Sequence, residues 1–257
     1  MSLPNFSNDE IMPTTLMSDS EVLGSGDVVL YKNFVSESEA NELFEELSVS
    51  VDFQQWYHMP SKNENPHPLK RIKRIMANID CQERIPYYRF PVNDQISHGM
   101  ITPMMPVVEN LRKRINEMLN VDLNHVVVLL YRDGSDCIGY HKDKTLDLDE
   151  EAPIISLSLG GTRTYCLQDL IFNPKIHQEI ELENGTLLVL GGKTNNTFYH
   201  SIKPSCDSDA KPRISITFRR AVTYLLPDGS LEGKGELYQT LNWPEELKGN
   251  HVEGYSG

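Results

Sequence analysis

The chain has 257 residues, enough for one large or two small domains with a sizeable core. Apolar residues make up 39% and charged residues 24%, and a net charge of -13 argues against a general nucleic-acid coat protein. The sequence has no run of eighteen apolar residues and no basic-then-apolar start, so we expect a soluble intracellular protein, cytoplasmic or nuclear. A disulfide scaffold or zinc ribbon is disfavoured by irregularly spaced cysteines: Cys81, Cys137, Cys166 and Cys206.

The first half of the chain predicts two helices. Residues 1–26 are polar and acidic, which indicates a flexible leader, and a short strand is expected at 28–31. Ser36 and Glu39 fit a capping box at the start of the first helix. The second helix is expected to begin at Thr102-Pro103, with an apolar stripe made of Val107, Val108, Leu111, Ile115, Met118 and Leu119.

A basic stretch lies between these helices, at Leu69-Lys70-Arg71-Ile72-Lys73-Arg74-Ile75, and Tyr87–Pro91 follows it. Basic residues beside aromatic ones favour a groove for a nucleic-acid strand. An edge strand with solvated lysines explains the same pattern. Both interpretations stay open on sequence alone.

The second half of the chain predicts a series of short strands. Gly, Asn, Asp and Pro clusters separate them, and a tail of unassigned role follows Pro227. Short strands after two helices predict a mainly β fold, a sandwich or jelly roll with flanking helices on one side. The expected strands are 126–131, 138–143, 154–159, 163–168, 179–182, 186–190, 198–203 and 213–219.

A candidate metal site combines His141 and Asp143 with His200. The first two residues lie two apart, so on a strand their side chains share a face. His200 follows Asp143 with several predicted strands between them, as a double-stranded barrel requires. Two histidines and a carboxylate leave half of an octahedron open, which is typical of non-heme Fe(II) oxygenases.

The last predicted strand carries polar and apolar residues in alternation. Arg213, Ser215, Thr217 and Arg219 share one face, which is either a solvent face or the lining of a polar barrel lumen. An arginine in a lumen needs an anion, and a dicarboxylate fits two arginines. Tyr131 adds a phenolic donor.

Together these segments resemble the AlkB family of Fe(II)- and 2-oxoglutarate-dependent dioxygenases. The resemblance implies a double-stranded β-helix (jelly-roll) dioxygenase core at 126–220 within a domain at 27–226. Its supporting and substrate-recognition part is 27–125, and 227–257 is a C-terminal extension. The matching motifs are Y-R-D-G-S-D-C-I-G-Y-H-K-D at 131–143, A-P-I-I-S-L-S-L-G-G-T-R-T-Y at 152–165, N-G-T-L-L-V-L-G-G at 184–192, T-F-Y-H-S-I at 197–202 and R-I-S-I-T-F-R at 213–219.

The resemblance also implies residue roles. Fe(II) and the catalysis are assigned to His141, Asp143 and His200. The co-substrate 2-oxoglutarate is assigned to Tyr131, Arg213, Thr217 and Arg219. The substrate is assigned to Tyr88, Phe90, Arg163 and Lys144, while the basic stretch is expected to lie away from the metal. The implied reaction uses O2 to demethylate N-alkylated bases in DNA or RNA, as a monomer without an obligate protein partner, and releases formaldehyde, succinate and CO2.

Four positions depart from the family pattern. Lys144 and Thr145 stand where many relatives carry two acidic residues, one of which reads the base, so the usual substrate is in question. Leu129 and Ser215 replace asparagines that often touch the co-substrate. Two alternatives therefore stay open: the same chemistry on a protein side chain or small molecule, and a non-catalytic binding module on the same fold.

Overall fold

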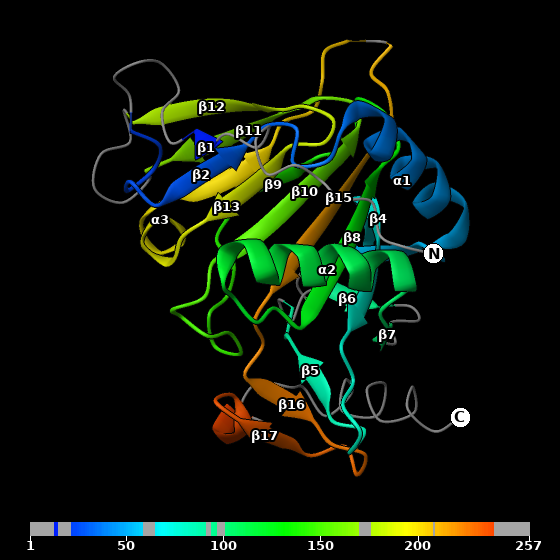
Figure 1. Cartoon of the computed structure of the whole chain (residues 1–257), viewed down its shortest axis with the longest axis vertical. Coiled ribbons are helices and arrows are strands. Elements are labelled where there is room, and N and C mark those ends of the chain that lie inside the picture. The colour runs from blue at the N-terminus through cyan, green and yellow to red at the C-terminus, as the bar shows by residue number, and fades with distance from the viewer. Residues whose placement is uncertain are drawn as a thin grey trace.

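The computed structural model describes residues 13–14, 22–58, 65–90, 94–96, 101–169, 176–207 and 209–238. Its largest sheet, the major sheet, is β1-β2-β13-β10-β15-β8-β4-β3-β6, with β7 beside β4 (Figure 1). These strands are β1 (Pro13–Thr14), β2 (Val28–Tyr31), β3 (Gln54–His58), β4 (His67–Ala77), β6 (Asp94–Ile96), β7 (Thr102–Pro103), β8 (His125–Tyr131), β10 (Ile154–Gly160), β13 (Leu187–Leu190) and β15 (Arg213–Arg219).

A smaller sheet, the minor sheet, faces the major one and completes a jelly roll. Its order is β12-β11-β14-β9, with antiparallel pairing throughout. Apolar side chains from both sheets fill the space between them, among them Leu30, Leu188 and Tyr165. The strands are β9 (Ile138–His141), β11 (Arg163–Gln168), β12 (His177–Leu182) and β14 (Tyr199–Ile202).

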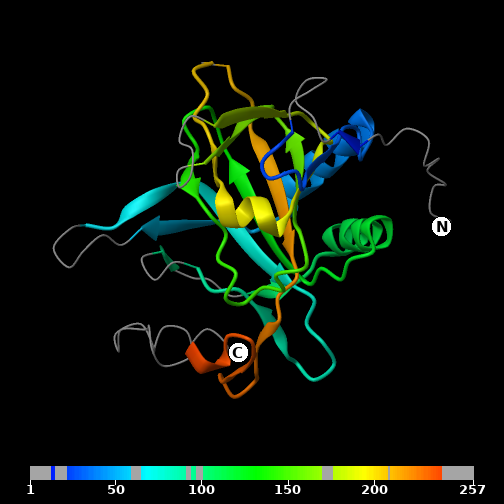
Figure 2. The same cartoon turned by 90° about the vertical axis from the view of Figure 1, so that its left-hand side faces the viewer.

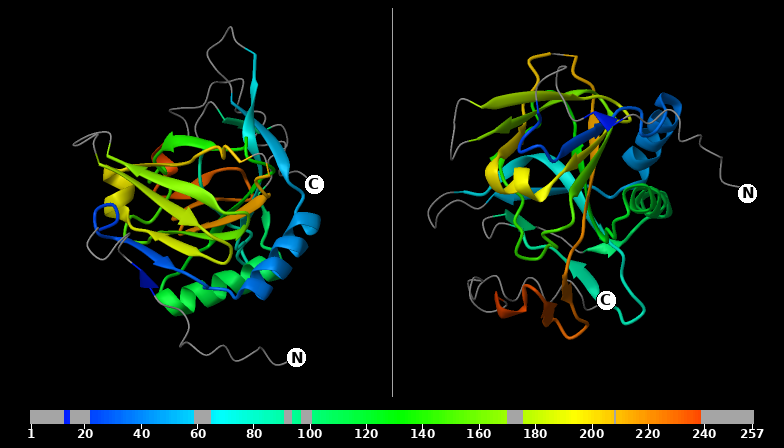
Figure 3. Two further views of the ribbon diagram at one scale, coloured as in Figure 1. Left: turned by 90° about the horizontal axis from the view of Figure 1, so that it is seen from above. Right: turned by 60° about the vertical axis from the view of Figure 1, so that its left-hand side comes forward.

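The helices α1 (Glu37–Ser50) and α2 (Pro106–Leu119) lie along the outer side of the major sheet (Figures 1 and 3). Their apolar stripes pack on outward residues of β8, β10 and β15, which forms the larger core. The Ser36 hydroxyl accepts from the Glu39 amide at 3.2 Å, so the predicted N-cap of α1 is confirmed. No helix of the described part of the chain is long and apolar enough to cross a membrane.

The strand β15 is buried along its whole length. Ile214, Ile216 and Phe218 point into the core under the helices. The alternate polar residues 213, 215, 217 and 219 are also buried, on the face toward the minor sheet. The polar face is therefore the lining of the jelly roll and not a solvent face.

Some boundaries differ from the expectation. The second helix begins at Pro106, with Met105 as N-cap, while Thr102–Pro103 forms β7 in parallel with β4. The expected leader 1–26 is in part packed: Leu23 is fully buried, and the Gly24 amide donates to Gln178 at 2.8 Å. Apart from β1 and residues 22–26, that range lies outside the described residues.

The start of the C-terminal extension is folded as well. It contributes to a third sheet, β17-β16-β5, which lies below the jelly roll in Figures 1 and 2. The elements are β5 (Ile85–Tyr87), β16 (Thr223–Leu225), β17 (Leu231–Gly233) and the 3-10 helix Glu236–Tyr238. Residues 239–257 lie outside the described part. Because β5 leads directly into Tyr88 and Phe90, this small sheet helps to position two predicted substrate residues.

Candidate functional site

Three potential metal ligands meet between the two sheets. β9 pairs with β14 so that His141 lies opposite His200, and their ring centroids are 4.2 Å apart. Asp143 lies two residues beyond the end of β9, so the strand is shorter than the predicted 138–143. The ligand atoms of the three residues all lie within 4.8 Å of one another. This donor set fits Fe(II) and leaves positions for other ligands.

Local hydrogen bonds orient the first two ligands. His141 Nδ1 lies 2.9 Å from the Gly139 carbonyl, so Nδ1 donates and Nε2 keeps the lone pair that a metal needs. The backbone of Asp143 is held by the Asn195 side chain, which accepts from its amide and donates to its carbonyl, both at 3.0 Å. Asn195 lies on the short helix α3 (Gly192–Thr197), between β13 and β14.

Charges around the triad set the protonation that metal binding requires. Burial raises the pKa of the Asp143 carboxyl, but Arg219, His200 and His141 outweigh burial and hold that pKa well below its usual range. Burial lowers the pKa of His200 to about 3, with a further contribution from His141. The carboxylate is therefore ionised and the imidazole neutral at neutral pH, which are the forms that bind a metal.

Arg219 and Tyr88 both contact the carboxylate of Asp143. Arg219 Nη2 donates to Oδ1 and Oδ2 at 2.9 and 3.0 Å, and the Tyr88 hydroxyl donates to Oδ1 at 3.1 Å. The Lys144 amide donates in turn to the Tyr88 hydroxyl at 3.2 Å. Arg219 Nε and Nη1 are buried without a hydrogen-bond partner in the described structure. The predicted role of Arg219 toward 2-oxoglutarate stays a prediction.

Arg213 lies deep between the sheets and is 1% exposed. Its Nη2 donates to the Ser158 hydroxyl at 2.9 Å, whereas Nε and Nη1 have no partner among the described residues. Its guanidinium carbon lies 5.2 Å from the centroid of the Tyr131 ring. A buried cation with unpaired donors is costly unless an anion reaches it, so this arrangement fits one carboxylate of a dicarboxylate.

A cavity of about 250 Å³ joins these groups. It is lined by the metal triad, the predicted 2-oxoglutarate residues and most of the predicted substrate residues. The predicted residues that line it are His141, Asp143, His200, Tyr131, Arg213, Thr217, Arg219, Tyr88, Phe90 and Lys144. Thr217 also shares a hydrogen bond of 2.8 Å with Ser156.

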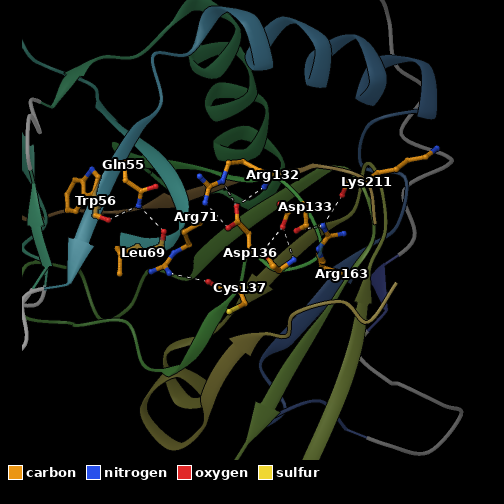
Figure 4. Close-up of polar contacts among 11 residues, drawn as sticks. Gln55, Trp56, Leu69, Arg71, Arg132, Asp133, Asp136, Cys137, Arg163 and Lys211 are labelled. Atoms are coloured by element: carbon orange, nitrogen blue, oxygen red, sulfur yellow. Dashed lines mark hydrogen bonds and ion pairs between the residues drawn. The ribbon is translucent and has the colours of Figure 1, made fainter. Parts of the chain in front are cut away.

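Arg163 does not line the cavity, and its predicted substrate role stays a prediction. Its guanidinium donates to the carbonyls of Thr162, Asp133 and Lys211 at 2.9–3.0 Å (Figure 4). Arg163 is the first residue of β11, whereas Tyr165, two residues further, stacks on His200 with ring centroids 5.6 Å apart. The side chain therefore ties loops together at the end of the strand, too far along it to face the metal.

The basic stretch also differs from expectation. It forms β4, which lies between β8 and β3 and is not an edge strand. Arg71 and Lys73 line the cavity that holds the metal triad, so the expected separation from the metal is wrong. Lys70 is exposed, and Arg74 reaches Asp52 at 3.4 Å. The alternation of a strand therefore divides the four cations between two faces.

Sequence reasoning missed several residues of this site. The Lys73 ammonium lies 3.4 Å from the Trp56 ring centroid and 4.0 Å from that of Phe90, a cation–π arrangement. The spacing of Arg71 and Lys73, two apart on a predicted strand, was a usable signal for a shared face. Asn195 had no such signal, because its contact depends on how α3 packs against the residues after β9.

A second group of possible metal ligands, Cys166, His177 and Glu179, lies on β11 and β12. None of the three lines the cavity. Glu179 already forms an ion pair with Lys203 and lies 3.7 Å from His177 Nδ1. The first group is therefore the candidate catalytic metal site.

Comparisons with known proteins agree with this geometry. The model of the 2OG-Fe(II) oxygenase superfamily matches residues 27–219. "DNA oxidative demethylase ALKBH2" of Mus musculus is 34% identical over 129 residues, which cover 46% of this chain and 52% of that protein. "Alpha-ketoglutarate-dependent dioxygenase alkB homolog 3" of Mus musculus is 27% identical over 205 residues, which cover 76% of this chain and 66% of that protein.

A solved structure, "The structure of OsALKBH1", is 18% identical with a TM-score of 0.49, and the match covers 76% of this chain and 96% of that one. The chain spans about half the length of the ALKBH2 proteins that it matches. The family model covers most of the chain, from just before β2 to the end of β15, and includes the metal triad and both buried arginines. The chain therefore belongs to the 2OG-Fe(II) oxygenase superfamily and to its AlkB family, whose cofactors are Fe(II), 2-oxoglutarate and O2.

Proposed function

We propose that this chain demethylates N-alkylated bases in DNA or RNA by oxidation. The observation that carries the proposal is one cavity in which the metal triad faces an aromatic and cationic wall. In that wall the Phe90 ring packs edge-on against Tyr88 and Trp56, with centroids 5.1 and 5.0 Å away. A base taken out of its stack needs such an aromatic surface, and Arg71 and Lys73 attract a polyanion.

The overall reaction balances without a further reductant. An N-methyl group, O2 and 2-oxoglutarate are converted into a demethylated nitrogen, formaldehyde, succinate and CO2. Fe(II), when bound, supplies the activation of O2 and the oxidation of the methyl C–H bond. The hydroxymethyl product on nitrogen breaks its C–N bond and its hydroxyl proton leaves. The nitrogen keeps the electron pair of that bond, as a lone pair in a ring that was cationic, and takes up a proton in a neutral base.

The residues of the chain hold and orient the reactants. His141, Asp143 and His200 provide the metal ligands, and Arg213 anchors a carboxylate of 2-oxoglutarate through its unpaired N–H groups. Arg219 and Tyr88 donate to the Asp143 carboxylate and fix it in one orientation within the cavity that the metal triad lines. The substrate methyl group must then be aimed at the metal by stacking of its base on Phe90.

The same chemistry on a protein side chain or small molecule is the second candidate, and the net charge of -13 together with Lys144 favours it. Both candidates are tested by incubation with Fe(II), ascorbate and 2-oxoglutarate, with methylated oligonucleotides and methylated peptides compared. We expect stoichiometric succinate and formaldehyde with oligonucleotides only. Turnover of peptides alone would support the second candidate, and absence of turnover with every substrate would favour a non-catalytic module.

A further inference from the structure

The cavity is strongly cationic although the chain is acidic. Within its described lining, Asp143 carries the only carboxylate, whereas six residues carry positive charges: Arg71, Lys73, Lys142, Lys144, Arg213 and Arg219. Six cations minus one carboxylate give +5 for these residues. The charges of Fe(II) and of 2-oxoglutarate cancel each other, so the two together leave this sum unchanged. The Lys142 ammonium donates to the Asn196 carbonyl, which does not neutralise its charge.

Two of these charges are fixed in the wall where the base would lie. Lys73 is 3% exposed, and its ammonium lies against the faces of Trp56 and Phe90. A base that stacks on the other face of Phe90 is therefore separated from this ammonium by one aromatic ring. Arg71 is two residues away on the same face of β4, and its Nη1 donates to the Cys137 carbonyl at 3.3 Å (Figure 4).

The third charge, Lys144, lies next to a predicted metal ligand. Lys144 directly follows the ligand Asp143, and its amide is held by the Tyr88 hydroxyl at 3.2 Å. Its side chain is exposed at the cavity, and no ion pair or hydrogen bond to its ammonium is recorded within the described residues. The ammonium can therefore turn toward a base whose methyl group points at the metal.

Such a lining discriminates between two kinds of methylated base. Methylation at N1 of adenine or N3 of cytosine gives a cationic ring with an exocyclic amino donor. The positive charges of the wall repel this ring, and they offer its amino group no hydrogen-bond acceptor. Methylation at N1 of guanine or N3 of uracil or thymine gives a neutral ring whose carbonyl oxygens accept hydrogen bonds. Lysine and arginine side chains are donors only, so the neutral rings complement them.

We propose that the preferred substrate is a neutral base methylated at a ring amide or imide nitrogen. This inference rests on the proposed dealkylation of nucleic acid and names the substrate class within it. Repulsion between unit charges several ångströms apart in a partly buried site corresponds to a discrimination of about tenfold to a hundredfold.

The test compares two oligonucleotides of one sequence that carry either 3-methyluracil or 3-methylcytosine. The two rings differ only in the exocyclic oxygen or amino group and in charge. We expect kcat/KM to be at least about tenfold higher for 3-methyluracil with the wild-type holoenzyme. Lys144→Glu should lower the ratio of kcat/KM for 3-methyluracil to that for 3-methylcytosine by about tenfold. Lys70→Glu makes an equal charge change at an exposed residue outside the cavity and should leave this ratio unchanged.

Equal rates for both bases, or a preference of the wild type for 3-methylcytosine, overturn the inference and leave the dealkylase function standing. Equal effects of Lys144→Glu and Lys70→Glu also overturn it, because the preference would then follow total charge and not the cavity wall. Turnover of neither base, with succinate formed only in the presence of peptides, contradicts the proposed function itself. The wild-type comparison needs no variant, so poor folding of Lys144→Glu leaves the test intact.

Discussion

Replacement of Arg213 by alanine should weaken 2-oxoglutarate binding far more than it weakens the fold. The guanidinium is 1% exposed, and Nε and Nη1 lack partners within the described residues. A charge-assisted pair with a carboxylate in such a site contributes about 1.5–3 kcal/mol. The KM for 2-oxoglutarate should therefore rise roughly tenfold to more than a hundredfold. Arg213→Lys should rescue poorly, because an ammonium lacks the planar fork of donors.

A thermal assay measures the same interaction without turnover. In wild type, a non-reactive 2-oxoglutarate analogue at a hundred times its Kd adds about 2.7 kcal/mol, which raises Tm by about 5–10 °C for a chain of this size. If Arg213→Ala lowers the affinity a hundredfold, the same concentration should raise Tm by about 1 °C. Arg163→Ala is the matched control, since the hydrogen bonds of that buried arginine within the described residues all go to backbone carbonyls. A wild-type KM and a wild-type Tm response in Arg213→Ala would refute the assignment.

Three further outcomes are expected. His141→Ala and Asp143→Ala should abolish turnover and most binding of Fe(II) or of a redox-inert surrogate, and calorimetric titration with unchanged affinity in both would contradict the metal assignment. Asp147→Asn should destabilise the fold by about 3–5 kcal/mol in chemical denaturation, because it leaves Arg89 buried without its two-point ion pair at 2.8 Å; a loss under 1 kcal/mol would contradict this. Burial lowers the pKa of His125 to about 3. When the pH falls below about 6.5, this histidine therefore binds a proton in the unfolded chain but stays neutral in the folded chain. The free energy of unfolding of the wild type should therefore fall between about pH 6.5 and about pH 5. Its slope against pH should be smaller in His125→Leu, by up to about 1.4 kcal/mol per pH unit. Equal slopes in the two proteins would refute this.

Alternation of residue types predicted the parts of the site that lie on strands. The polar face of β15, opposite Ile214, Ile216 and Phe218, was visible in the sequence, and burial decided between solvent and lumen. His141 and His200 were predicted from spacing, and strand pairing places them opposite each other. These features depend on local periodicity, which the sequence carries directly.

The errors arose where distant segments decide the outcome. Thr102-Pro103 and Met105-Pro106 offer similar helix starts, and the parallel contact of β7 with β4 selects the second. Nothing local distinguishes an edge strand from one flanked on both sides, so the position of β4 beside β8 was not predictable. Arg163 shares strand parity with Tyr165, but a separation of about 7 Å along β11 moves it to other partners.

The absence of a solvent face along β15 has a consequence for how substitutions in it would behave. In a library of variants scored for protein abundance, positions 214, 216 and 218 should be intolerant, and positions 213, 215 and 217 more tolerant of small residues, which gives a period of two. Scored for turnover, the same seven positions should all be intolerant, since the apolar ones maintain the core and the polar ones line the cavity that contains the metal triad. The difference between the two profiles would separate structural from chemical constraint residue by residue within one strand.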